Sequence, residues 1–399
     1  MLTENNLERY ADVLLWALKT AKKKPLQKND IVLIQYDLPA LRLTELLYAR
    51  LLDMGMRPVQ RVAATCRMEQ SFYQKANLKQ LTFIAPGDEE LYQHIAGRMY
   101  LHAPESLTHL KGIDPARIGK AMVARKPLKD ILDRREEQRK YSWTLCLLPT
   151  QELARQANMS LAKYTAQIVK GCYLDCDNPV SEWQRIHKEV TLIKKRLSAL
   201  PVKYFHMESA NMDLRITPGD QRKWAGVSGH NVPSFEVFVS PDWRGTEGVY
   251  YANLPSYRSG NYVKDVRITF AKGQAVKIEA GEGGDFVKKQ LAMDPGARRV
   301  GEFSLTDKRF SRIDKFMAET LFDENFGGKV GNSHIALGSS YSDTFAGNPA
   351  KLTGAMKKKL GFNDSALHWD LVNTEPKTVT AHLSNGKKRV IYDRGIFTL

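Results

Sequence analysis

The chain has 399 residues, which is longer than a single domain with one hydrophobic core usually is, so we expect two domains. A secreted or membrane protein is not expected, because the polar N-terminus lacks a signal-peptide pattern and no apolar run approaches the roughly 18 residues of a spanning helix. The net charge of +16 is compatible with nucleic-acid binding, but the basic residues are spread along the chain, and in the densest stretch, 125–140, acids lie among them as on a solvated helix face.

The cysteines are few and scattered over a long chain, which is typical of a reduced, cytoplasmic protein. Cys172 and Cys176 form a C-x-x-x-C pair, but no second pair completes a zinc site of the usual four-ligand kind. We therefore expect a cytoplasmic protein and assign no function to its cysteines.

The first half of the chain alternates between helical and strand patterns. Apolar residues at helical spacing predict helices, and short apolar runs predict buried parallel strands. The first strand–helix–strand run indicates a βαβ unit, and this half is expected to be an α/β domain. In chain order, the expected elements are a helix at 7–22, a strand at 30–36, a helix at 41–52, strands at 57–63 and 142–148, and helices at 151–170 and 181–200.

Near residue 201 the pattern changes, and strands dominate the rest of the chain. Asn385-Gly386 is a favoured two-residue turn and predicts a hairpin close to the C-terminus. We therefore expect an α/β N-terminal domain over residues 1–200, followed by a β-rich α+β C-terminal domain over 201–399. The expected elements are strands at 204–208, 212–217, 236–239, 249–251, 266–270 and 276–279, and helices at 286–293 and 352–360.

His368-Trp369-Asp370 places two side chains that can bind metal two residues apart in an apolar, strand-like setting. Alternate residues of a strand point to the same face, so His368 and Asp370 would offer an imidazole nitrogen and a carboxylate oxygen to one point in space. Trp369 would then face the interior. The alternative is an ordinary, partly exposed strand with two polar side chains in water, and this short motif alone leaves it open.

Three further polar residues enter or leave apolar strand-like runs of the second half. Glu236 heads Glu-Val-Phe-Val, Glu302 lies within Val-Gly-Glu-Phe-Ser-Leu, and His334 begins an apolar run that ends just before Tyr341. A buried carboxylate needs a partner, and a structural ion pair would satisfy each one separately. Together with the His-x-Asp pair, however, they give three carboxylates and two imidazoles, which suits two divalent metals with a bridging carboxylate.

In these same motifs the chain resembles the metallo-aminopeptidases of the thermophilic-aminopeptidase family, of the aminopeptidase T type. The resemblance extends over nearly the whole chain, and several motifs occur in the family's order. The motifs that carry it are Asn231-Val-Pro-Ser-Phe-Glu-Val-Phe, Gly301-Glu-Phe-Ser-Leu, Leu321-Phe-Asp-Glu-Asn, His334-Ile-Ala-Leu-Gly-Ser-Ser-Tyr and His368-Trp-Asp.

The resemblance implies a role for each site residue. Glu302 would bridge the two metals, and Tyr341 would lie close to the reacting carbonyl. The chain departs from the family pattern in two places: it reads Phe235-Glu236 where the family often has two adjacent acids, and the segment 326–333 before the histidine is longer than usual. The metal ligands implied are Glu236, Glu302, His334, His368 and Asp370.

The function expected from this resemblance is a two-metal aminopeptidase, with the C-terminal domain as its catalytic part. It would hydrolyse the first peptide bond of peptides with a free α-amine, using zinc, cobalt, manganese or magnesium. A homodimer with active sites facing an internal cavity is implied, with neither nucleic acid nor membrane as a partner. The alternatives are a two-metal phosphoesterase, which the positive charge would assist, and a basic nucleic-acid-binding protein without catalysis.

Overall fold

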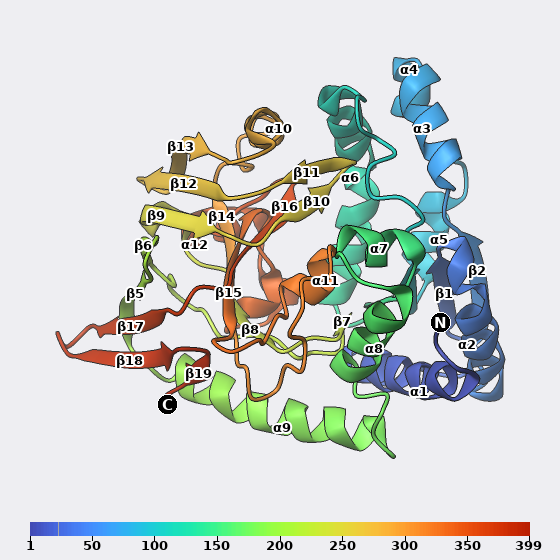
Figure 1. Cartoon of the computed structure of the whole chain (residues 1–399), viewed down its shortest axis with the longest axis horizontal. Coiled ribbons are helices and arrows are strands. Elements are labelled where there is room, and N and C mark those ends of the chain that lie inside the picture. The colour runs from blue at the N-terminus through green and yellow to red at the C-terminus, as the bar shows by residue number, and fades with distance from the viewer. Residues whose placement is uncertain (23) are drawn as a thin grey trace. The chain divides into compact units, whose positions relative to one another are not determined.

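The computed structural model describes residues 1–22 and 24–399 and divides into two compact units (Figure 1). The first unit comprises residues 1–187 with the short segments 227–234 and 317–321. The second unit comprises residues 188–226, 235–316 and 322–399. Each unit is built around its own β-structure, parallel in the first and antiparallel in the second.

The first unit contains a five-stranded parallel sheet in the order β2-β1-β3-β4-β7. The predicted βαβ unit is confirmed, because β1 and β2 are parallel neighbours joined by a helix. Strand β1 is central and mostly buried, which is why its sequence is an unbroken apolar run. The strands are β1 Ile31–Tyr36, β2 Arg57–Val62, β3 Gly97–His102, β4 Ser142–Leu147 and β7 Asn231–Val232.

The helices of the first half agree with the expected pattern except in the middle. The predicted helix at 151–170 is two helices, because Asn158 adopts a positive φ of 53° and Ser160 caps the second one. Strand β3 and helices α3 to α5 were not expected. The helices are α1 Glu4–Ala21, α2 Leu41–Asp53, α3 Cys66–Lys75, α4 Leu78–Leu81, α5 Asp88–His94, α6 Pro115–Glu137, α7 Gln151–Gln156, α8 Leu161–Gly171 and α9 Pro179–Ser198, with a 3-10 turn at Leu38–Ala40.

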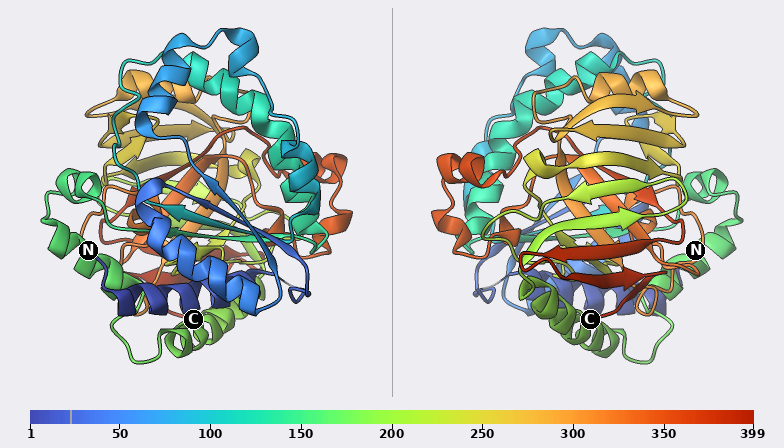
Figure 2. Two further views of the ribbon diagram at one scale, coloured as in Figure 1. Left: turned by 90° about the vertical axis from the view of Figure 1, so that its right-hand side faces the viewer. Right: turned by 90° about the vertical axis from the view of Figure 1, so that its left-hand side faces the viewer.

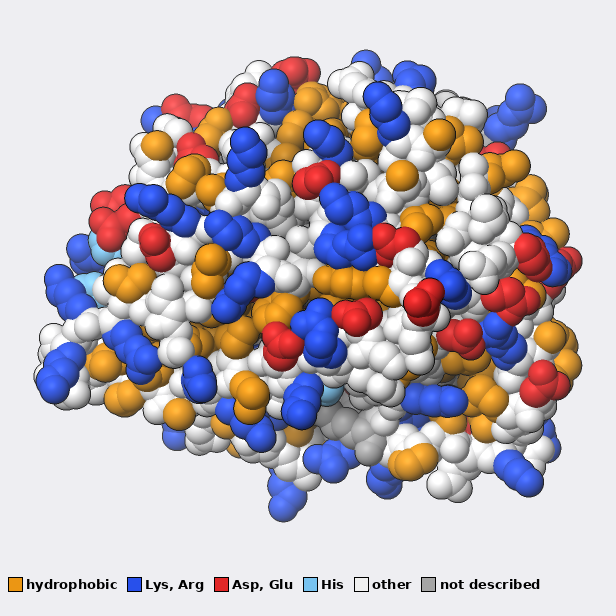
Figure 3. Space-filling view, turned by 60° about the horizontal axis from the view of Figure 1, so that its bottom comes forward, with side chains coloured by type: hydrophobic (Ala, Val, Ile, Leu, Met, Phe, Trp, Pro, Cys, Tyr) orange, Lys and Arg blue, Asp and Glu red, His pale blue; other side chains and the backbone are white. Residues whose placement is uncertain are grey.

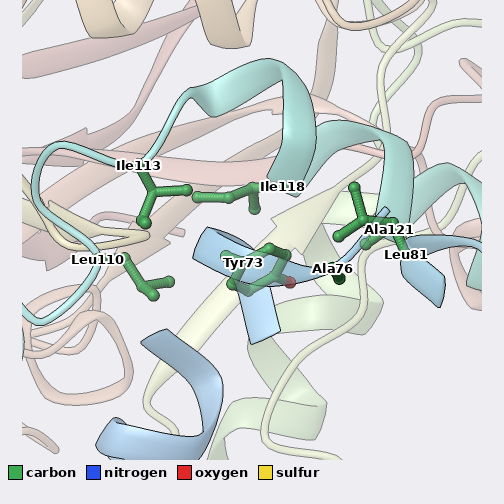
Figure 4. Close-up of a cluster of buried hydrophobic side chains, with 7 residues drawn as sticks. All are labelled: Tyr73, Ala76, Leu81, Leu110, Ile113, Ile118 and Ala121. Carbon is green, nitrogen blue, oxygen red and sulfur yellow. The ribbon is translucent and has the colours of Figure 1, made fainter. Parts of the chain in front are cut away.

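A small apolar cluster holds α3 and α4 against the start of α6 (Figure 4). Tyr73 of α3 lies among aliphatic side chains of α6 and of the loop that precedes it. Since the cluster is apolar, it accounts for the packing of these helices and offers no catalytic group. Its members are Tyr73, Ala76, Leu81, Leu110, Ile113, Ile118 and Ala121.

The second unit contains an eight-stranded antiparallel sheet in the order β13-β12-β9-β6-β5-β17-β18-β19. Figure 2 shows its strands side by side, from yellow β12 and β9 through green β6 and β5 to red β17 and β18. The predicted hairpin is confirmed, and Gly386 supplies its positive φ of 81°. The strands are β5 Val202–Glu208, β6 Asp213–Ile216, β9 Glu247–Ala252, β12 Val266–Ala271, β13 Gln274–Glu279, β17 Thr378–Leu383, β18 Lys388–Asp393 and β19 Ile396–Phe397.

A four-stranded antiparallel sheet in the order β16-β15-β14-β8 forms the rest of the second unit's framework. Strands β14 and β15 are buried along their whole length. Its strands are β8 Glu236–Val239, β14 Val300–Thr306, β15 Asn332–Gly338 and β16 His368–Asn373. Shorter elements are the hairpin of β10 Ser256–Arg258 and β11 Asn261–Val263, helices α10 Gly284–Gln290, α11 Thr320–Asp323 and α12 Gly354–Leu360, and 3-10 turns at Trp243–Gly245, Ser342–Thr344 and Pro349–Lys351.

The expected fold class is confirmed: a parallel α/β sheet occupies the first half of the chain, and antiparallel sheets dominate the second. None of the helices in the described residues combines the length and apolar character needed to cross a membrane. On the face shown in Figure 3, Lys and Arg side chains are dispersed and Asp and Glu side chains lie among them.

Candidate metal centre

The four-stranded sheet places all five predicted ligands on one of its faces. Ala336 of β15 pairs with Glu302 on one side and with Asp370 on the other, so these three positions form one row. His334 and His368 each lie two residues from this row along their own strands and therefore share its face. Glu236 of β8 pairs with Thr306, which shares the face of Glu302, and so completes the set.

The opposite face of the same strands is apolar, which explains how the polar face is held. Trp369, between His368 and Asp370, is only 1% exposed, and its Nε1 donates to Ser256 Oγ over 3.1 Å. This confirms the alternation expected for His-Trp-Asp. Beside Asp370 and His368, β15 presents the small residues Ala336 and Gly338 on the polar face.

The candidate ligand atoms lie close enough together to share a metal ion. His334 Nε2 is 3.2 Å from Glu302 Oε1, 3.4 Å from Glu236 Oε2 and 3.8 Å from Asp370 Oδ1. His368 Nε2 is 3.4 Å from Asp370 Oδ1. Ligand atoms about 2.0–2.2 Å from one metal lie roughly 3–3.5 Å apart, so these separations fit metal coordination.

The two carboxylate oxygens of Glu302 face different imidazoles. Its Oε1 is near Nε2 of His334, and its Oε2 is 3.9 Å from Nε2 of His368. A break in strand register between Val300 and Glu302 marks a bulge at Gly301, where a Cβ would lie 2.2 Å from the carbonyl oxygen of Gly338. Only glycine fits this close approach, which aligns Glu302 with Ala336.

The imidazole of His368 is oriented by its other nitrogen. Nδ1 lies 2.9 Å from the carbonyl oxygen of Ser339, which can only accept, so Nδ1 carries a hydrogen and Nε2 is the nitrogen that faces the carboxylates. The backbone of His368 is also held, because Nη1 of Arg258 donates to the carbonyl oxygen of His368 over 2.9 Å. This is the arrangement that metal-binding histidines commonly show.

The pKa values of the cluster reflect crowded, buried carboxylates. Burial, helped by the negative charge of Glu302, raises the pKa of Glu236 to about 8. Burial alone would lower the pKa of His334, but its hydrogen bond with Glu302 and the charge of Asp370 outweigh it and raise that pKa to about 9. Burial alone would raise the pKa of Asp370, but the charge of His368 and its hydrogen bond outweigh burial and lower that pKa to about 2. The cluster therefore holds protons that cations would displace.

Glu324 is a sixth candidate ligand that sequence reasoning missed. One of its oxygens lies within 4.8 Å of a ligand atom of His334 and of Asp370, and the residue is 6% exposed. Its backbone carbonyl accepts hydrogen bonds from Thr306 Oγ1 and from Asn332 Nδ2. The available signal was the acid pair Asp323-Glu324, which directly follows the apolar Leu321-Phe322.

Tyr341 lies beside the cluster, with its ring tilted against His368 at 4.8 Å between centroids. It is 37% exposed, so its side chain is accessible from outside the cluster. Burial of its hydroxyl and the charges of nearby carboxylates, Glu302 first, raise its pKa well above the usual range. The hydroxyl therefore stays protonated and can donate a hydrogen bond at neutral pH.

The set of ligand atoms fits two divalent cations. Four carboxylates surround two imidazoles, and when ionised they carry four negative charges, which two divalent ions balance. Buried carboxylates at such separations repel one another unless protons or cations lie between them. The six residues, all in the second unit, are Glu236, Glu302, Glu324, His334, His368 and Asp370.

Comparisons with known proteins agree with this geometry. The sequence profile of the family described as thermophilic metalloprotease (M29) matches residues 3–397. The chain is 28% identical to aminopeptidase AmpS of Bacillus subtilis over 78% of each chain, and 28% identical to aminopeptidase T of Thermus aquaticus over 72% of each. Its fold is similar to that of the solved wild-type AmpT from Thermus thermophilus, with a TM-score of 0.78, 22% identity and 99% of both chains covered.

Proposed function

The chain belongs to the thermophilic metalloprotease family (M29) and is a metal-dependent aminopeptidase, and we propose that it works with two divalent ions bridged by Glu302. The observation that carries the two-ion proposal is that the oxygens of Glu302 face two different imidazoles. The catalytic part is then the C-terminal domain over 201–399, with 1–200 as a separate α/β domain. The proposed ligands are Glu236, Glu302, Glu324, His334, His368 and Asp370.

When bound, two such ions supply a strong nucleophile from water near neutral pH and polarise the scissile carbonyl. The residues of the chain do the rest. Glu302 would offer one oxygen to each half of the centre, and the Ser339 carbonyl fixes the orientation of His368. The crowded carboxylates attract cations, and a bound cation favours the deprotonated form of the side chains around it, so metal binding would release protons from the site.

Tyr341 is proposed as the donor that stabilises the reacting carbonyl. Its hydroxyl keeps its proton, and its ring lies against His368 at the accessible side of the cluster. Hydrolysis of an amide places negative charge on the carbonyl oxygen, and a positioned hydroxyl donor stabilises that charge by several kcal/mol, typically about 3. Tyr341 therefore contributes to turnover without holding metal.

The substrates proposed are peptides with a free α-amine, since the named relatives are aminopeptidases. The two alternatives, a phosphoesterase and a nucleic-acid-binding protein, are not favoured by the family to which the chain belongs. Imidazole and carboxylate ligands together suit zinc, cobalt or manganese better than magnesium, which prefers oxygen ligands and water. We propose a cytoplasmic homodimer, which the family resemblance supports and sedimentation velocity can test.

The central test measures metal content and peptidase activity together. The purified protein should bind two divalent ions per chain, lose leucyl-arylamide hydrolysis on chelation and regain it when zinc, cobalt or manganese is returned. N-acetyl-leucyl-arylamide and nitrophenyl phosphate serve as matched controls and should be poor substrates. Equal hydrolysis of the acetylated substrate would contradict the proposed need for a free amine.

A further inference from the structure

We propose that Asn363 and Ser240 are positioning residues, which fix the loop at 338–341 so that it orients both His368 and Tyr341. The inference rests on the proposed two-metal function and assigns to two residues outside the ligand set a part in building the site. Neither residue is within the cluster of carboxylates and imidazoles. Both act through the loop that follows β15.

The loop at 338–341 makes two separate contacts with the centre. The carbonyl oxygen of Ser339 accepts the hydrogen of His368 Nδ1, which leaves Nε2 as the ligand atom. At the end of the loop, Tyr341 places its ring against the same imidazole. A displacement of this loop would therefore disturb a metal ligand and the proposed carbonyl donor together.

Asn363 ties the start of the loop to the chain segment before β16. Its Nδ2 donates to the carbonyl oxygens of Gly338 (2.6 Å) and Gly296 (2.8 Å), and its Oδ1 accepts from Nη1 of Arg299 (3.4 Å). The side chain is 4% exposed and uses both of its amide hydrogens. Removing the side chain would take one donor from each of these carbonyl oxygens, and the Gly296 oxygen would keep the N–H of Arg299 at 3.1 Å.

The backbone of Asn363 strengthens the same connection. Its N–H donates to Ser340 Oγ (3.0 Å), and its carbonyl accepts from the N–H of Ser340 (2.9 Å). Gly338 has a φ of 107°, and a Cβ there would lie 2.1 Å from the carbonyl oxygen of Leu367. The backbone at this turn therefore requires glycine at 338. Asn363 holds the Gly338–Ser339 peptide unit, which directly precedes the Ser339 carbonyl.

Ser240 ties the end of the loop to the strand that begins with Glu236. It directly follows β8, is completely buried, and its Oγ accepts from the N–H of Tyr341 over 2.8 Å. Its own carbonyl is held by Nε of Arg222 at 2.7 Å. Since the bond reaches only Tyr341, loss of the hydroxyl should affect the carbonyl donor and leave the ligands in place.

The two residues thus predict different defects, and the experiment separates them. In the full chain, N363A should weaken binding of one of the two zinc ions by about 10- to 100-fold in a chelator competition, the usual loss when a group that orients a metal-binding histidine is removed. S240A should keep both zinc affinities within about twofold while kcat falls about tenfold at unchanged KM, since one positioned donor is disturbed. Zinc affinity is read independently of activity.

N373A is the matched control, because Asn373 is also fully buried and its Nδ2 donates to a backbone carbonyl, that of Tyr251, away from the loop. It should keep zinc affinity and kcat near those of the natural chain. If N363A unfolds, the isosteric N363D and the milder S340A, which removes the acceptor for the Asn363 N–H, are measured in its place.

The outcomes distinguish the two levels of the proposal. If the natural chain binds zinc and cleaves leucyl-arylamide but the Asn363 variants match N373A in zinc affinity, the positioning role of Asn363 is wrong and the function stands. If S240A loses zinc or keeps full kcat, the role of Ser240 is wrong. If the natural chain binds no zinc and cleaves no arylamide, the proposed function fails and takes this inference with it.

Discussion

Nε2 of His368 lies 3.4 Å from Oδ1 of Asp370, two residues further along the same strand. The pair faces the cluster while the residue between them is buried on the other side of the sheet. A strand with period two therefore supplies two neighbouring candidate ligand atoms from three consecutive residues. This relationship can be tested residue by residue.

Replacing His368 or Asp370 with Ala should lower bound metal and activity together, because each change removes a proposed ligand. W369F should instead keep metal content and cost about 1–2 kcal/mol of folding stability, since it shrinks a buried side chain and removes the hydrogen bond to Ser256. Metal analysis beside thermal melts separates the two results. If both Ala variants keep two ions per chain, the pair is ordinary strand surface.

E302Q should nearly abolish activity while the chain stays folded. The amide keeps the shape of the side chain but cannot bridge two cations with two anionic oxygens. Folding should survive, because the negative charge of Glu302 opposes ionisation of buried Glu236 in the metal-free protein. Turnover above about half that of the natural chain, with normal circular dichroism, would rule out the bridging role.

Y341F should lower kcat by roughly a hundredfold and leave metal content unchanged, which is the usual loss of one donor to the reacting carbonyl. The aromatic ring, and with it the contact with His368, is retained. Metal content after gel filtration is the control measurement. Loss of metal in this variant would show that Tyr341 supports the ligands instead of the substrate.

The stabilisation given by metal should increase with pH between about 6.5 and 9. In the metal-free protein the raised pKa values of Glu236 (about 8) and His334 (about 9) mean that both hold protons which the unfolded chain has released. The stability from those protons is fully present below the usual values of 4.5 and 6.5 and is lost as pH rises through 8 and 9. Metal binding needs the same groups deprotonated.

The measurement is the difference in melting temperature between zinc-loaded and metal-free protein at a series of pH values. Other titrating groups, such as the buried amines of Lys194 and Lys377, affect both forms and cancel in the difference. A difference that stays constant or shrinks from pH 6.5 to 9 would show that these two groups do not release protons to metal.

The spacing of apolar and turn residues correctly predicted those elements whose structure depends on neighbours in sequence. The alternation of His368, Trp369 and Asp370 is confirmed, as are the first βαβ unit and the hairpin at Asn385-Gly386. Strand β3 was missed although it is paired on both sides, since Gly97–His102 has no long apolar run. Its position is set by neighbours far away in sequence.

Sequence periodicity brought together the candidate ligands that lie on strands, and it missed the features that depend on distant contacts. Glu324 lies outside any periodic segment and is aimed by hydrogen bonds from Thr306 and Asn332 to its backbone. The bulge at Gly301 and the loop held by Asn363 depend on contacts with the carbonyl oxygen of Gly338, which is far from both in sequence, so no local pattern reveals them. Likewise, the segments 227–234 and 317–321 join the first compact unit through contacts that are distant in sequence, namely the pairing of β7 with β4 and the hydrogen bond from the Tyr164 hydroxyl to the carbonyl oxygen of Met317.

Ala336 has a consequence for sequence variation. It stands between Glu302 and Asp370 in one row of the sheet, on a strand whose other face carries Ile335 and Leu337. In a saturation library, tolerance at Ile335 and Leu337 should follow hydrophobicity, as at any packed core position. At 336 it should follow volume alone, so that glycine and serine survive selection for activity while valine and leucine, the commonest residues of buried strands, are eliminated.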